Sequence, residues 1–492
     1  MTRRLALVLL LAIPRTAAAE PRPDEGGLWS FDRSDLIQFH DDGPVRVHYS
    51  VDGPNRTLLT DVDGDTIPDY AQDVAATTIA ALALYTGELG LRAPVPETRV
   101  GDPLGGSEAI DVYLVDFGGA ADGRFGIDAC TTHCAGFLVV ENDFAGYGYP
   151  SRRAAIDTVV SHELFHAVQA AYAELPVWAS EGTATWAERQ YDPASADFLG
   201  KCNGYLAETS RPIYAPPPGP VPAFAYGSAL FWDFLSIRHD ASIVAALLEA
   251  VERSGDPPEL AVIGVLEERD DSLEQAWPEF ARWNLATGFR SGVATSYAYA
   301  DRLDAILPDH EGDALDLDAR LYPLAASYLR LDHGGGTLHA GADAGLPGVA
   351  FSLHPVAEFE EDGAVGDAIA TFTLDAAGTR VVYEALPPGG YFVVVAYADV
   401  ADATARARVC IGDEAAVAPC HVEGEEDSSG SESGTTLDVS SSTTDGGEAS
   451  TDGDDPDAMP SADGCGCRSG APSPGLVGVA LAMVRRRRSR SR

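Results

Sequence analysis

The segment HELFH at residues 162–166 restricts the fold of this chain more than any other feature. If residues 152–173 form a helix, the four-residue spacing places His162 and His166 on one face, one turn apart. Both imidazoles can then bind a single metal ion, with Glu163 beside them to take a proton from water. The alternative is that both are core histidines whose ring nitrogens are satisfied by backbone carbonyl groups.

The flanking sequence supports this helix and predicts a second one. Apolar residues recur at helical spacing around the motif, at Ile156, Val159, Val160, Leu164, Val168 and Tyr172. After a break at Pro176 we expect a second helix over Ala179–Gln190, which carries Glu181 near its start. The two histidines and a third ligand from this helix would form a catalytic zinc site, in which one position stays open for water.

Composition restricts the partners of the protein. The 492 residues carry a formal net charge of −43, so a nucleic acid would be repelled, and we expect no such partner. Part of the acidic excess lies in residues 423–463, which contain acidic groups but no lysine or arginine. This segment is also rich in serine, threonine and glycine, which predicts a disordered linker.

The N-terminus predicts export. Arg3 and Arg4 precede an apolar run over residues 5–13, and the small residues 17–19 offer a cleavage site before Glu20. We therefore expect residues 1–19 to be a secretory signal peptide.

Export makes disulfide bonds available to the cysteines. We expect two pairs, Cys130 with Cys134 and Cys410 with Cys420. Cys202 is then left over, and a zinc site that includes His133 is the alternative for the first pair.

The C-terminus has three parts. A cysteine motif at residues 464–467 is followed by an apolar run over 475–484 and by arginines at 485–488. The run is too short to span a bilayer, which needs about 20 residues. The whole of residues 464–492 resembles a sorting signal of the MYXO-CTERM type, which implies anchoring at the cell surface or outer membrane. The alternative is a disordered basic tail.

An acidic segment between a strand expected over residues 45–51 and a helix expected over residues 70–89 predicts a structural calcium site. The candidate ligands are Asp61, Asp63, Asp65 and Asp69. Carboxylates at alternate positions are what a calcium loop needs. The glycine stands fourth rather than sixth as in an EF-hand, and Gln72 occupies position twelve. A solvated acidic turn is the alternative.

Two runs, Ile110–Val115 and Gly136–Val140, predict buried strands. The second comes shortly before the HELFH helix, and we expect it to be an edge strand that could accept an extended peptide.

The rest of the chain divides by pattern. We expect a catalytic region over residues 20–222, a helical subdomain over 223–310 and a β-sandwich over 316–422, because the last region has short alternating runs separated by turns. The expected fold class is α+β.

Four segments together carry a family resemblance. The chain contains DVDGDTIPD from residue 61, ENDF from 141, HELFHAVQ from 162 and WASEGTATWAE from 178. This combination resembles a family of predicted secreted zinc metalloproteases common in myxobacteria and, more broadly, the gluzincin clan. The resemblance covers roughly residues 45–300 and implies a gluzincin-like metallopeptidase domain.

The resemblance also implies roles for single residues. His162, His166 and Glu181 would bind zinc, and Glu163 would be the general base. Glu188 is the competing third ligand; otherwise it orients a ligand.

A tyrosine would complete such a site by donating to the substrate oxyanion. Tyr226, in the segment AYGSA, is the candidate that the resemblance implies, and Tyr214 is the alternative donor. The other interpretation of Tyr226 is a packed tyrosine at the start of a helix.

These features favour a secreted or surface-held zinc metalloprotease that acts on peptides or proteins. We favour an endopeptidase over an aminopeptidase, because no GxMEN-like segment offers an anchor for a terminal amine. The alternatives are a catalytically inactive surface adhesin on a peptidase scaffold and a structural envelope protein.

Overall fold

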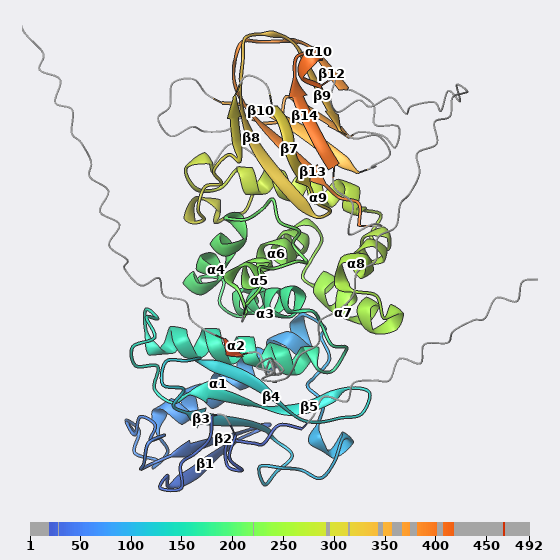
Figure 1. The fold of residues 1–492 in the computed structure, drawn as a ribbon. Helices are drawn as coiled ribbons and strands as arrows, with labels where there is room; N and C mark the ends of the chain where they lie inside the picture. The colour runs from blue at the N-terminus through green and yellow to red at the C-terminus, as the bar shows by residue number, and fades with distance from the viewer. Residues whose placement is uncertain are drawn as a thin grey trace, which may run out of the picture.

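The computed structural model confirms the α+β class. It describes residues 19–27, 29–219, 221–291, 296–312, 315–342, 348–356, 367–373, 381–400, 407–417 and 466–467. A mixed sheet lies at one end of the molecule, helices fill the middle, and two further sheets form the other end (Figure 1). Residues 1–18 of the expected signal peptide, Cys420, the expected acidic linker and most of the expected sorting signal lie outside the described residues.

The first sheet is mixed. Its strands, in spatial order, are β1 (Ile37–Asp42), β2 (Val45–Ser50), β3 (Ile110–Val115), β5 (Cys134–Glu141), β4 (Gly123–Cys130) and β15 (Gly466–Cys467). Strands β2, β3 and β5 are parallel, whereas β4 is antiparallel to β5. The expectation that Gly136–Val140 is an edge strand is therefore wrong, because β5 pairs with β3 on one side and with β4 on the other.

Two helices cover one face of this sheet. They are α1 (Asp69–Ala83), which continues as a π-helical turn over Leu84–Glu88, and α2 (Arg152–Gln169), the helix expected from the HELFH motif. The Ser151 side chain accepts a hydrogen bond from the backbone N–H of Ala154 and so caps the start of α2. Apolar residues of β3 and β5 pack with those of α1 and α2 in one core.

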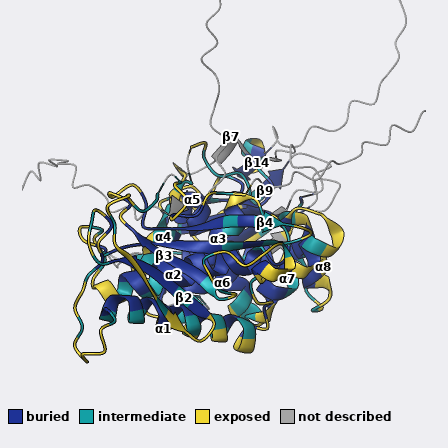
Figure 2. Cartoon of the chain, turned by 90° about the horizontal axis from the view of Figure 1, so that it is seen from below, coloured by how far each residue is buried: buried dark blue, intermediate teal, exposed yellow. Residues whose placement is uncertain are grey.

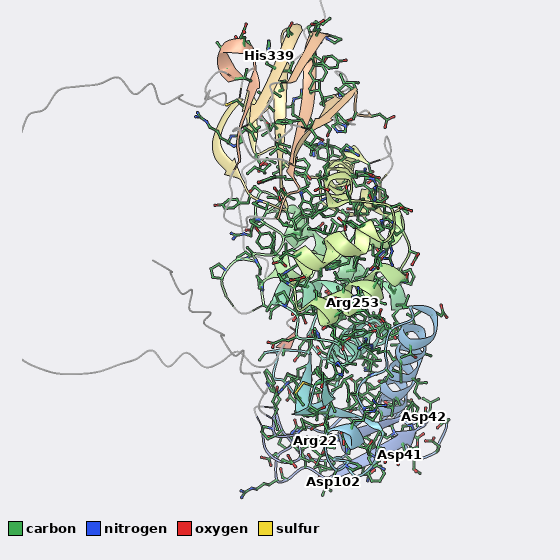
Figure 3. The ribbon with its side chains drawn as sticks, turned by 90° about the vertical axis from the view of Figure 1, so that its right-hand side faces the viewer. Arg22, Asp41, Asp42, Asp102, Arg253 and His339 are labelled. Atoms are coloured by element: carbon green, nitrogen blue, oxygen red, sulfur yellow. A yellow bond between two sulfur atoms is a disulfide. The ribbon has the colours of Figure 1, made fainter. Side chains whose placement is uncertain are left out.

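The N-terminal segment is fixed by a buried ion cluster at the same sheet. Arg22, labelled in Figure 3, is 1% exposed. Its guanidinium contacts the carboxylates of Asp111 at 2.5 Å, Asp128 at 2.6 Å and Glu97. The neighbouring Glu20 pairs with Arg124 of β4. Because three buried carboxylates share this guanidinium, removing it would leave Asp111 with only its contact to His48 Nε2 at 2.8 Å and would deprive Asp128 and Glu97 of their cation.

Helices form the middle of the molecule. They are α3 (Val177–Tyr191), α4 (Ala196–Leu206), α5 (Ala223–Gly227), α6 (Ala229–Arg238), α7 (Ser242–Ser254), α8 (Pro258–Glu267) and α9 (Leu273–Leu285), with 3-10 turns at Glu97–Arg99, Gly288–Arg290 and Ala300–Arg302. Figure 2 shows α2 and α3 mostly in the buried colour, whereas α7 and α8 carry exposed residues. Helix α3 packs against α2, α5 and α6, so it lies between the sheet and the other helices.

The remaining strands form two sheets that share an apolar core. One sheet has the order β11 (Ala370–Thr373), β10 (Val349–Pro355), β13 (Gly389–Tyr397), β8 (Ala325–His333) and β6 (His310–Gly312); the other has β12 (Val381–Leu386), β9 (Gly336–Ala342), β14 (Ala407–Gly412) and β7 (Leu315–Leu321), followed by α10 (Glu414–Val417). Leu329 of β8 and Val395 of β13 belong to the same core as Leu338 of β9 and Ile411 of β14. The sheet that contains β10 and β13 packs its outer face on α9, where the indole N–H of Trp277 donates to the Ala325 carbonyl.

The cysteines follow the expected pairing where the structure describes them. Cys130 and Cys134 form a disulfide, and His133 pairs with Glu252 through Nε2 at 2.6 Å, so the alternative zinc site at these residues is wrong. Cys410 is disulfide-bonded, and Cys202 is a free, buried thiol. Within the described part of the chain, every helix is too short or too polar to cross a membrane.

We expect Arg22→Met to lower the free energy of unfolding by about 3–5 kcal/mol, because it leaves buried carboxylates without a counter-charge. Denaturant unfolding measures this change. The exposed Arg33→Met is the control and should shift stability by no more than about 0.5 kcal/mol. Equal midpoints for the two variants would contradict the structural role of the cluster.

Candidate metal centre

Helices α2 and α3 bring three buried ligand groups together. Glu181 Oε2 lies 3.2 Å from His162 Nε2 and 3.7 Å from His166 Nε2. One ligand atom from each residue lies within 4.8 Å of the other two. The two histidines come from adjacent turns of α2. Glu181 comes from the second turn of α3, which packs against α2 at this point.

Each histidine is oriented through its second ring nitrogen. His162 Nδ1 lies 2.6 Å from Glu188 Oε1, and His166 Nδ1 lies 2.8 Å from Gln169 Oε1. With a proton on each Nδ1, both Nε2 lone pairs are available to a cation at Glu181. Glu188 therefore contacts the opposite side of the His162 ring from Glu181, which fits an orienting role better than that of third ligand.

Gln169 also joins the two helices, and the sequence analysis missed it. Its amide nitrogen donates to the Ser180 carbonyl and to Thr183 Oγ1, both at 2.8 Å. The only sequence signal was its position three residues after His166, on the same helix face.

Burial and charge act in opposite directions on these groups. Burial lowers the pKa of His162, but hydrogen bonds to Glu181 and Glu188 outweigh it and raise the pKa well above its usual value. Burial raises the pKa of Glu181, but His166 and His162 together hold it far below the usual range. The carboxylate thus keeps its negative charge inside the protein and favours positive charge beside it.

The donor set fits zinc. Two imidazole nitrogens and one carboxylate are typical of catalytic zinc sites with an open fourth position. His166 Nε2 and Glu181 Oε1 are buried, and neither has a hydrogen-bond partner among the described residues. The interpretation of both histidines as core residues bonded to backbone carbonyls is wrong, because their nitrogens face carboxylate and amide side chains.

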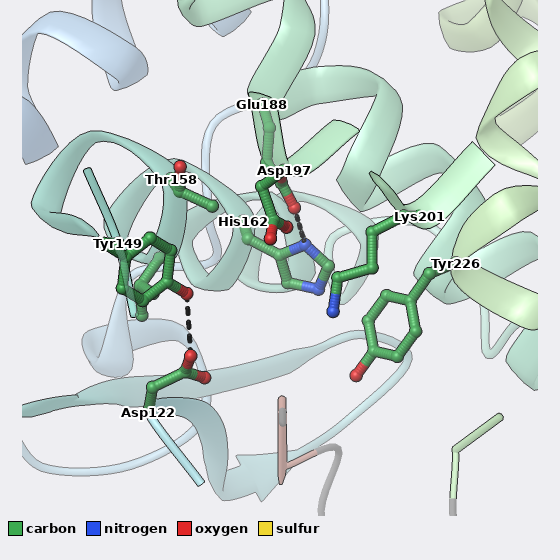
Figure 4. Close-up of a pocket in the computed structure, with 9 residues that line it drawn as sticks. Asp122, Tyr149, Thr158, His162, Glu188, Asp197, Lys201 and Tyr226 are labelled. Carbon is green, nitrogen blue, oxygen red and sulfur yellow. Dashed lines mark hydrogen bonds and ion pairs between the residues drawn. The ribbon is translucent and has the colours of Figure 1, made fainter. Parts of the chain in front are cut away.

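A charged hollow adjoins His162 (Figure 4). It is small and is lined by Asp122, Tyr149, Thr158, Val159, His162, Glu188, Asp197, Lys201 and Tyr226. The Tyr226 ring lies 5.8 Å from the His162 ring, whereas Tyr214 is not part of this lining. Of this lining, only His162, Glu188 and Tyr226 were expected from the sequence; the groups supplied by α4 and by the loops before β4 and α2 were not.

Strand β4 passes directly beside Glu163. A Cβ added to Gly123 would lie 2.9 Å from Glu163 Oε1 and 2.4 Å from Val159 Cγ1, so only glycine permits this approach. On its outer side, β4 pairs at Gly123 and Arg124 with Gly466–Cys467. The edge of β4 next to Glu163 is thus able to accept an extended chain.

The acidic loop before α1 gathers three of its four predicted ligands. Asp61, Asp63 and Asp65 are exposed and lie within ligand reach of one another, while Asp69 is not in this group and instead accepts the backbone N–H of Val62. Asp61 accepts the N–H groups of Gly64 and Thr66, which closes the loop. The calcium site remains a prediction.

No protein-family model matches this chain, and no curated protein matches it either.

If the acidic loop binds calcium, millimolar Ca²⁺ should raise the melting temperature and a chelator should lower it, because binding to the folded state alone stabilises it. Differential scanning fluorimetry measures the shift. Asp63→Ala should abolish the shift, and a wild-type protein that melts at the same temperature in Ca²⁺ and in chelator would remove the calcium site.

Glu181→Gln should lose stoichiometric zinc, whereas Glu188→Gln should still bind it with about 10–100-fold lower affinity, because only the orientation of His162 suffers. Zinc content after dialysis against a competing chelator distinguishes the two. The opposite order of affinities would make Glu188 the third ligand.

Proposed function

We propose that this protein is a secreted, gluzincin-like zinc metallopeptidase that hydrolyses internal peptide bonds, with Glu163 as the general base. The observation that carries the proposal is the buried cluster of His162, His166 and Glu181, whose ring nitrogens are oriented by Glu188 and Gln169. A bound zinc ion would act as a Lewis acid that polarises a carbonyl and makes water acidic enough to lose a proton near neutral pH.

Glu163 would carry out the proton transfers of the reaction. Glu163 follows His162 directly in α2 and is fully buried, next to the strand edge where a peptide would lie. It takes a proton from the attacking water, a bond forms between the water oxygen and the carbonyl carbon, and the carbonyl π pair moves to oxygen. The carbon–nitrogen bond then breaks, and the proton passes from Glu163 to the leaving amine.

Substrate orientation follows from the same geometry. An extended peptide that pairs with β4 at Gly123 and Arg124 would run beside Glu163, with side chains alternating toward and away from the hollow. Tyr226, which lines the hollow next to His162, is the donor that would bind the carbonyl oxygen.

The proposed location of the protein at the cell surface rests on its sequence. The signal peptide directs export, and the cysteine, apolar and arginine segments at the C-terminus hold the enzyme at the cell surface. We favour an endopeptidase because the sequence contains no GxMEN-like segment, the terminal-amine anchor of the aminopeptidase type.

Glu163→Gln should bind zinc and fold as wild type but lower kcat by about 10²–10⁴-fold, because the amide accepts no proton. A casein or peptide-library digest followed by mass spectrometry measures cleavage. The exposed Glu174→Gln, on the loop after α2, is the matched control and should cleave normally.

Retained hydrolysis in the Glu163 variant would contradict the mechanism. A wild-type protein without stoichiometric zinc and without cleavage would instead favour the inactive adhesin.

A further inference from the structure

The chain contains a single lysine. Of its 33 basic residues, 32 are arginines (33 − 1) and the remaining one is Lys201. Nine of the 492 positions line the hollow beside His162, about one in fifty, and Lys201 is among them. The one lysine side chain of the sequence therefore lies at the candidate metal centre.

Close helix packing fixes Lys201 relative to Tyr226. The Lys201 Nζ lies 4.2 Å from the centroid of the Tyr226 ring, and this ring lies beside His162. Helices α4 and α5, which carry the two residues, approach so closely that a Cβ on Gly227 would lie 2.6 Å from the Lys201 carbonyl oxygen. The backbones that carry the two side chains are therefore fixed relative to each other.

The surroundings indicate what the ammonium binds. The charged groups that share the hollow are the carboxylates of Asp122, Glu188 and Asp197. They would repel an acidic substrate side chain, which excludes a subsite for such side chains. A peptide carbonyl is neutral when it binds and becomes negative only as water adds, so a fixed ammonium stabilises it most at that moment.

The difference between lysine and arginine supports this role. An ammonium is a compact point charge with three donors, whereas a guanidinium is a broad planar fork suited to carboxylates and phosphates. A single carbonyl oxygen that binds both the Lys201 side chain and the Tyr226 hydroxyl is better matched by the compact ammonium than by a guanidinium.

We propose that Lys201 is a catalytic residue whose ammonium group, together with the Tyr226 hydroxyl, binds the oxygen of the scissile carbonyl and stabilises its negative charge. This inference rests on the proposed peptidase function.

Kinetics give the first test. Lys201→Met should lower kcat by about 10²–10³-fold with KM nearly unchanged, as expected for loss of one oxyanion donor. Lys201→Arg should recover part of the loss because it restores the charge. The control is Arg253→Met, which removes an exposed cation of α7 and should behave as wild type.

The single lysine allows a second readout on the unaltered protein. Reductive methylation of zinc-loaded wild type modifies only Lys201 and the α-amine, and peptide mass mapping separates the two. A phosphonate analogue of the best-cleaved peptide carries charged tetrahedral oxygens in place of the carbonyl. At saturation it should protect Lys201 from methylation and leave the α-amine reactive.

Methylation of Lys201 at the same rate with and without bound phosphonate would overturn the proposal, even if Lys201→Met is slow, because the kinetic loss would then be structural. Wild-type kcat in Lys201→Met would overturn it as well, while leaving the peptidase function intact. A zinc-loaded wild type that cleaves no peptide would contradict both.

Discussion

The close packing of α3 against its neighbours determines where the third ligand lies. Gly182 follows Glu181 directly, and a Cβ at Gly182 would come within 2.0 Å of Ser228 Oγ and 2.9 Å of Trp232 Nε1. Ser228 in turn donates to the Trp178 carbonyl at the start of α3. This contact holds α3 against α5 and α6 on one side, while Gln169 ties it to α2 on the other. The Glu181 carboxylate is therefore held beside the rings of His162 and His166.

Burying the ligand side chains together is unfavourable in free energy, and hydrogen bonds from neighbouring side chains offset this cost. Two imidazoles and two carboxylates are buried together, where unpaired charges are unfavourable. Each ring nitrogen that faces away from Glu181 contacts Glu188 or Gln169, so the ring orientations are fixed before any cation arrives. The same helices place Tyr226 and Lys201 beside the cluster, and β4 supplies a strand edge beside Glu163 that would align a substrate.

Local patterns in the sequence predicted the parts of this site that depend on one helix at a time. The spacing of His162 and His166 and the apolar residues around them predicted α2, and the short alternating runs predicted sandwich strands. The sequence analysis missed Gln169, Lys201 and Arg22, because their roles arise from contacts between elements far apart in the chain. The place of β4 between β5 and β15, beside Glu163, was missed for the same reason: strand order depends on pairing across the sheet, and periodicity within a strand does not reveal it.

The most direct measurement is a crystal structure of the zinc-loaded protein with anomalous diffraction collected at the zinc absorption edge. The account predicts one strong peak, with His162 Nε2, His166 Nε2 and a Glu181 oxygen at about 2.0–2.2 Å. It also predicts that Glu188 still bonds to His162 Nδ1. A peak coordinated by Glu188 in place of Glu181, or no peak between α2 and α3, would contradict it.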